Sequence, residues 1–271
     1  MRLHTANGSD ETAREEPQGI FGRILARLRA LRLRGVPRSP YRVPALVFGT
    51  ARFLALALFT FGMAYVEAAC VVYLWEMLYP EGFRFPLLLV VEERYEPLVA
   101  LEMGRELATM VMLVGCAVAA GRTKVQRVAS FLFLFGTWDI FYYFWLRVMT
   151  ALTHFPAFPA SLGTWDILFL VPVPWTGPVY APMVIAVTMA LFAVLLVFAE
   201  RRGVRIKPDL RFWIIEAIAA LMLFGSFVWN CKRILTNQVP SSYPWWLLLP
   251  GEIIAVTAFL YLIRECLSRE T

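Results

Sequence analysis

The residues of this 271-residue chain that could do chemistry are ionisable side chains embedded in long apolar runs. Placing such a group in a bilayer costs about 2.5–3.5 kcal/mol, so each one is a candidate for function. Glu102 and Glu106 are four residues apart, and Arg105 lies three from Glu102, so the three share one face of a helix. The candidate pocket residues are Glu67, Glu102, Arg105, Glu106, Asp139, Tyr142, Arg147, Asp166 and Glu252.

The types of side chain in this set limit the chemistry that it can do. Carboxylates with almost no imidazole suit protons or hard cations such as Mg²⁺ and Ca²⁺, rather than zinc or copper. No organic cofactor is predicted, and a hard divalent cation, if bound, would take Glu67, Glu106 and Asp139 as ligands. Alternatively, Arg105 and Arg147 hold a lipid phosphate while a carboxylate acts as a general base.

Several familiar functional signals do not occur in the sequence. It contains no G-x-x-x-x-G-K-[ST], G-x-S-x-G or H-E-x-x-H motif, and its four cysteines are scattered without zinc spacing. The net charge of +6 comes largely from short basic segments between apolar runs, a pattern typical of cytoplasmic loops rather than of a nucleic-acid surface. ATPases, serine hydrolases, zincins and nucleic-acid binding are therefore disfavoured.

The elements that must position these side chains are membrane helices. Apolar residues make up 59% of the chain and charged residues 17%, against roughly 45–50% and about 25% in soluble domains. Six runs approach the ~20 residues that a bilayer requires, and their backbone groups must be satisfied internally, so we predict an all-α fold of six transmembrane helices. The predicted spans are about 53–75, 98–120, 128–152, 179–199, 212–229 and 245–263.

The rest of the chain divides into a tail, a surface helix and one interrupted segment. Residues 1–17 are polar and predicted to be disordered. The pattern of residues 18–43 predicts a basic amphipathic helix and its linker. This helix either binds anionic lipids at the membrane surface or packs on a partner. Residues 44–271 form the transmembrane domain. Its segment 165–175, before the fourth span, is apolar but broken by prolines, and reads either as a re-entrant element or as a loop leading into a kinked helix.

The distribution of basic residues predicts the orientation. Of the 26 Lys and Arg residues, the predicted outer loops and outer span ends hold only Arg84, Arg94, Arg147, Lys232 and Arg233. By the positive-inside rule both termini lie in the cytoplasm, in a cell membrane that is most simply a bacterial inner membrane. Folding the spans accordingly puts the candidate pocket residues in the outer half of the bilayer and Glu216 toward the inside.

Three functions are compatible with such a pocket. The first is a carrier of a small solute coupled to protons or a small cation, with Glu67, Glu106 and Asp139 as the coupling site. The second is an enzyme acting on a lipid-linked or isoprenoid substrate at the outer leaflet. The third is a structural or assembly subunit of a membrane complex or homo-oligomer, in which the charged residues only join helices.

Overall fold

The computed structural model describes residues 22, 50–79, 95–153, 165–236 and 238–268. The predicted tail and nearly all of the predicted surface helix lie outside these residues and stay predictions. Among the described residues, six helices are long and apolar enough to cross a membrane, which confirms a multi-pass membrane protein. They are α2 (Thr50–Leu78), α4 (Glu96–Ala120), α5 (Lys124–Thr153), α6 (Tyr180–Arg201), α7 (Leu210–Val228) and α9 (Trp245–Ser268).

Local sequence sets several of the helix ends. The side chain of Asp209 accepts a hydrogen bond from the N–H of Phe212 at 2.9 Å and so caps the start of α7. The hydroxyl of Thr123 does the same for the N–H of Gln126 at the start of α5, at 3.1 Å. Beyond α7 the chain turns into the short helix α8 (Cys231–Leu235). The apolar runs between these caps have no water to bond their backbone, which leaves the helix as their stable form.

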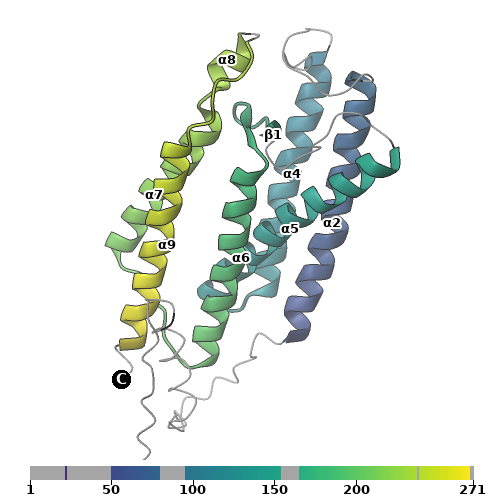
Figure 1. Ribbon diagram of the computed structural model, residues 1–271. Helices are drawn as coiled ribbons and strands as arrows, with labels where there is room; N and C mark the ends of the chain where they lie inside the picture. The colour runs from purple at the N-terminus through teal and green to yellow at the C-terminus, as the bar shows by residue number, and fades with distance from the viewer. Residues whose placement is uncertain (1–21, 23–49, 80–94, 154–164, 237, 269–271) are drawn as a thin grey trace, which may run out of the picture.

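The helices form two groups that meet at α6 (Figure 1). In one group α5 runs obliquely and packs against α2, α4 and α6. In the other, α7 and α9 form an antiparallel pair, and α9 also contacts α6. The approach of α5 to α6 depends on Gly136, where an added Cβ would lie 2.4 Å from the carbonyl oxygen of Ala186. Small residues allow such close helix packing in membranes.

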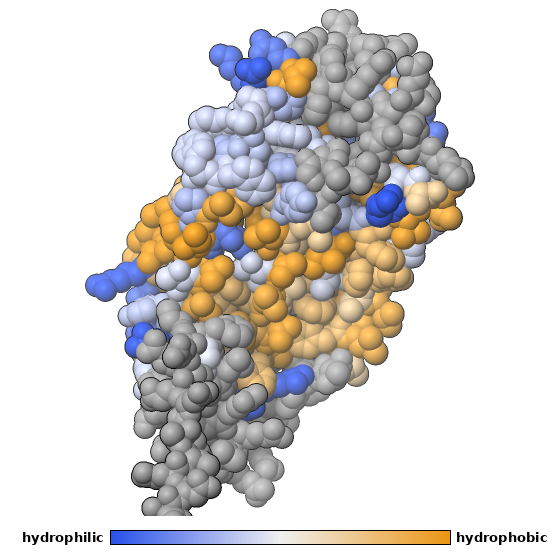
Figure 2. All heavy atoms as spheres, viewed as in Figure 1, coloured by the Kyte–Doolittle hydropathy of each residue, from blue (hydrophilic) through white to orange (hydrophobic). Residues whose placement is uncertain are grey.

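The molecular surface has the character expected of a membrane protein. In Figure 2 hydrophobic residues spread across the middle of the molecule, while hydrophilic ones gather at its ends. Many large apolar side chains on the spanning helices are exposed, among them Leu58, Leu107, Leu191 and Leu221. An exposed apolar surface of this extent requires cover, and the lipid bilayer supplies it.

The segment before α6 is an exception to a mostly helical fold that agrees with the all-α prediction. It forms an antiparallel hairpin of strands β1 (Trp165–Phe169) and β2 (Trp175–Pro178), with an irregular register between Ile167 and Phe169. The hairpin is neither a half-helix nor a simple loop. β2 packs against α6 and α7, and the tip of the hairpin reaches the face of α4 that carries Glu106.

Side-chain chemistry explains why this segment pairs as strands. Pro172 and Pro174 cannot continue a helix, and the apolar and aromatic residues around them favour an extended backbone. Pairing two strands satisfies most of the backbone groups that a broken helix would leave open. At Gly177 the ring of Tyr243 lies so close that an added Cβ would be 2.8 Å from its Cε2.

Candidate functional site

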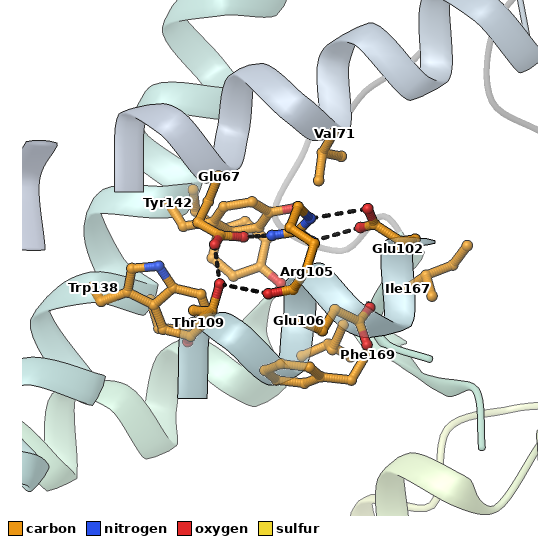
Figure 3. A pocket seen from close by; sticks show the side chains of 13 residues that line it. Glu67, Val71, Glu102, Arg105, Glu106, Thr109, Trp138, Tyr142, Ile167 and Phe169 are labelled. Carbon is orange, nitrogen blue, oxygen red and sulfur yellow. Dashed lines mark hydrogen bonds and ion pairs between the residues drawn. The ribbon is translucent and has the colours of Figure 1, made fainter. Parts of the chain in front are cut away.

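Arg105 of α4 lies at the centre of a group of acidic side chains, between Glu67 of α2 and Glu102 of its own helix (Figure 3). Its Nε lies 2.9 Å from Oε2 of Glu102, one turn earlier on α4. Its Nη1 forms an ion pair with Glu67, which is only 6% exposed. One guanidinium therefore serves two carboxylates and joins two helices that are separated in the sequence by a long connection.

Thr109 is a member of this group that sequence reasoning missed. Its hydroxyl forms a hydrogen bond with Oε1 of Glu67, also across the α2–α4 contact. Thr109 lies four residues after Arg105, so it falls on the same face of α4. This four-residue spacing is the feature of the sequence that could have identified Thr109. A threonine within a helix is uninformative by itself because its hydroxyl can also bond its own backbone, as Thr109 does with the Arg105 carbonyl at 3.2 Å.

Glu106 is held by the hairpin rather than by a cation. Its carboxylate accepts the backbone N–H of Leu170 at 2.8 Å and of Val171 at 3.2 Å. Ten residues separate Glu106 from the start of α4, so it lies about 15 Å along that helix. A side chain thus provides the acceptor for two backbone N–H groups at the hairpin tip. Backbone groups in a membrane need such partners because no water is present.

Asp139 of α5 faces the same space without a compensating group. It is 8% exposed, and within the part of the chain that the structure describes it makes neither a hydrogen bond nor an ion pair. Its neighbour Trp138 has a buried indole N–H that likewise finds no acceptor among the described residues. A carboxylate so placed is costly unless it binds a proton or another cation.

Asp166 lies beside this space, on the hairpin. The Tyr143 hydroxyl donates to its Oδ2 at 3.1 Å and the Ile167 N–H to its Oδ1 at 2.7 Å. The side chain is almost completely buried, and that burial raises the pKa of Asp166 to about 7, although both hydrogen bonds act in the opposite direction. Tyr143 lines the space that Asp139 faces, so Asp166 is connected to it through one side chain.

These side chains enclose a cavity of about 50 Å³ between α2, α4, α5 and β1. We call Glu67, Glu102, Arg105, Glu106 and Asp139 the acid cluster. The remaining lining residues are Val71, Thr109, Trp138, Tyr142, Tyr143, Ile167, Leu168 and Phe169. A polar cavity of this size holds a few water molecules. Among the described residues there is no group of three or more His, Cys, Asp or Glu side chains placed to bind a metal ion.

Three predicted pocket residues do not line this cavity: Asp166 lies beside it, and Arg147 and Glu252 lie elsewhere. Arg147 is exposed and lies two turns beyond Asp139 on α5. Glu252 lies on α9, where its contacts are Thr188 of α6 and Glu216 of α7. Glu216, which was predicted toward the inside, interacts electrostatically with Glu252. The shared error is that similar depth in the membrane was taken as proximity.

Comparisons with known proteins add no relative. No protein-family model matches the chain, and neither a curated protein nor a solved structure matches it. The function must therefore be inferred from the site itself.

Proposed function

We propose that the chain is a proton-coupled carrier of a small solute and that the acid cluster is its proton-binding site. The observation that carries this proposal is Asp139, a carboxylate facing a small polar cavity with no cation or hydrogen-bond donor from the described residues. Intramembrane acids in such settings are the usual proton relays of pumps and transporters.

The charge balance of the cavity supports the same function. Four carboxylates line it, while Arg105 supplies a single positive charge that Glu67 and Glu102 already share. Four ionised acids around one guanidinium would leave a large negative charge in a region of low dielectric. Binding protons relieves that charge, and releasing them restores it, so the occupancy of the site responds strongly to pH.

The size of the cavity favours protons over a large ligand. About 50 Å³ takes a few waters, and it is too small for a lipid headgroup. An enzyme with Arg105 and Arg147 as a phosphate clamp gains no support, because Arg105 is engaged by two glutamates and Arg147 is exposed elsewhere. A structural role, in which the charged residues only join helices, fits the ion pairs of Arg105, but it leaves Asp139 without a partner among the described residues.

The proposed setting follows from the basic residues. Their distribution supports cytoplasmic termini and a place for the acid cluster in the outer half of a cell membrane, most simply a bacterial inner membrane. The basic segment at 18–43 then lies on the cytoplasmic surface with anionic lipids.

Reconstitution tests the carrier. Purified protein is placed in vesicles that contain a pH-sensitive dye, and inward gradients of Na⁺, K⁺, Mg²⁺, amino acids and sugars are applied in turn. We expect one solute class to drive proton movement, Asp139→Asn to abolish it, and Glu96→Gln, at the exposed start of α4, to preserve it. Proton movement equal to that of protein-free vesicles for every solute, or a chemical change in the vesicle lipids detected by mass spectrometry, would contradict the proposal.

A further inference from the structure

The second group of helices contains an acidic pair of its own, remote from the acid cluster. Glu216 of α7 and Glu252 of α9 lie close enough to interact electrostatically. We call them the glutamate pair. Neither residue lines the cavity of the acid cluster, so the two groups of acids are separate.

The two helices approach each other closely at this point. Next to Glu252 stands Gly251, where an added Cβ would lie 3.0 Å from Cβ of Met222 and 3.3 Å from the carbonyl oxygen of Ala219. Side chains beside such a contact have little freedom to turn away toward lipid headgroups. Glu252 is therefore buried where α9 meets α7 and α6, and Glu216 is partly buried on α7 beside it.

Neither glutamate has a positive partner. The deeper parts of α6, α7 and α9 hold no other charged residue, because their remaining charged residues are at the ends: Glu200, Arg201, Arg211, Arg264 and Glu265. Within the described residues no lysine, arginine or histidine forms an ion pair with Glu216 or Glu252. Two ionised carboxylates here would repel each other without any compensation.

Unsatisfied oxygens point to what is bound there. Glu252 is only 8% exposed, and Oε1 of each glutamate is buried without a hydrogen-bond partner among the described residues. An ionised oxygen in that state is far from water and from any donor. A proton bound to a carboxyl group removes its charge and so lowers this cost.

Thr188 of α6 gives an independent indication. Its hydroxyl is hydrogen-bonded to Glu252, and it also donates to the carbonyl oxygen of Val184 at 3.1 Å. A hydroxyl has one hydrogen. That single hydrogen is divided between the Val184 carbonyl and Glu252, so Thr188 gives an ionised Glu252 only part of a hydrogen bond.

We infer that Glu216, Glu252 and Thr188 form a second proton-binding site, in which the glutamate pair holds at least one proton at neutral pH. The site shares no residue with the acid cluster, so the inference does not depend on the proposed carrier function. Its ligand is a proton rather than a metal ion, because two carboxylates and one hydroxyl supply fewer oxygens than Ca²⁺ takes and include none of the waters that Mg²⁺ retains.

Infrared spectroscopy of the full chain in lipid nanodiscs tests this site. The carbonyl stretch of a protonated carboxyl is separate from the amide and carboxylate bands and shifts in D₂O. In sodium-free buffer at neutral pH, we expect the double variant Glu216→Gln/Glu252→Gln to lose one such band that the wild type shows. The matched control Glu265→Gln, at the far end of α9, retains it.

A second variant covers the case in which the double variant does not fold. Thr188→Val is close to isosteric and removes only the hydroxyl, so it should shift the same band without abolishing it. Equal carboxyl bands in the wild type and the double variant would overturn the inference, as would a band that Thr188→Val leaves unchanged. A band that disappears on adding Na⁺ but not K⁺ would assign the site to sodium and overturn it too.

Discussion

The two helical groups bury acidic side chains in different ways. In the group of α2, α4 and α5, carboxylates are offset by contacts: Arg105 between Glu67 and Glu102, and the hairpin N–H groups against Glu106. In the group of α6, α7 and α9, the polar neighbours of Glu216 and Glu252 among the described residues are each other and a threonine. The difference is between buried acids that fixed donors satisfy and buried acids that lack a cation among the described residues, and Asp139 belongs to the second kind although it lies in the first group.

Removing the central cation should have the largest effect. Arg105→Met leaves Glu67 and Glu102 buried without their partner, and we expect a loss of about 3–5 kcal/mol in the free energy of unfolding. Denaturant unfolding in mixed micelles measures it. Arg147→Met, at an exposed position on α5, should cost about 0.5 kcal/mol or less. Equal losses in the two variants would show that Arg105 does not hold the first group together.

Loosening the hairpin should have a smaller effect. Glu106→Gln replaces a carboxylate that accepts the N–H groups of Leu170 and Val171 with a weaker neutral acceptor. We expect a cost of about 1–3 kcal/mol, and faster hydrogen exchange at those two amides. Exchange at the hairpin that is no faster than in Glu96→Gln would mean that Glu106 does not anchor the hairpin.

Asp166 gives stability a dependence on pH. Its folded-state pKa of about 7 lies above the ordinary value of 3.8, so the folded chain binds the proton more tightly than the unfolded chain. This contribution to the free energy of unfolding is present in full below 3.8, the pKa in the unfolded chain. It is lost as pH rises through about 7, by at most about 1.4 kcal/mol per pH unit.

Melting temperatures measured across this range check the Asp166 prediction. Asp166→Asn should flatten the profile, because the neutral amide does not titrate. Tyr143→Phe should extend the loss to higher pH, because it removes a hydrogen bond that favours the ionised form. Wild-type and Asp166→Asn profiles that run parallel would refute the assignment.

The smallest effect is expected where two neutral groups join α2 to α5. The hydroxyls of Thr60 and Thr137 lie 3.1 Å apart and form a hydrogen bond. A double-mutant cycle with Thr60→Val and Thr137→Val should give a coupling of about 0.6 kcal/mol, the average found for such bonds in membrane proteins. A coupling as large as the loss in Arg105→Met would remove the distinction between charged and neutral contacts in this group.

The spanning helices could be predicted from the sequence because length and polarity decide them. The run predicted at 98–120 is the helix Glu96–Ala120, and the run at 128–152 is Lys124–Thr153 with its polar first turn added. The hairpin could not be predicted, since a short apolar run broken by prolines does not show whether it pairs with itself. Its anchor, the Glu106 carboxylate, is 64 residues away in the sequence.

The site was predictable only in part. The sequence indicates how deep a residue lies in the membrane, but not which neighbouring helix its side chain faces. Glu102, Arg105 and Glu106 share one face of α4 by their spacing, and they do lie together. Arg147 follows Asp139 by eight residues, which turns it about 80° around α5 and moves it about 12 Å along the axis. Glu252 has a suitable depth, but α9 packs mainly against α7 and α6, and Glu252 does not line the cavity of the acid cluster.

The most direct test of the acid cluster as a proton-binding site is a pH jump on vesicles adsorbed to a sensor electrode. Proton binding within the membrane displaces charge and gives a transient current even when no solute is present. We expect the wild type to show this current, Asp139→Asn to lose most of it, and Glu96→Gln to keep it. A transient in Asp139→Asn equal to that of the wild type would contradict the account.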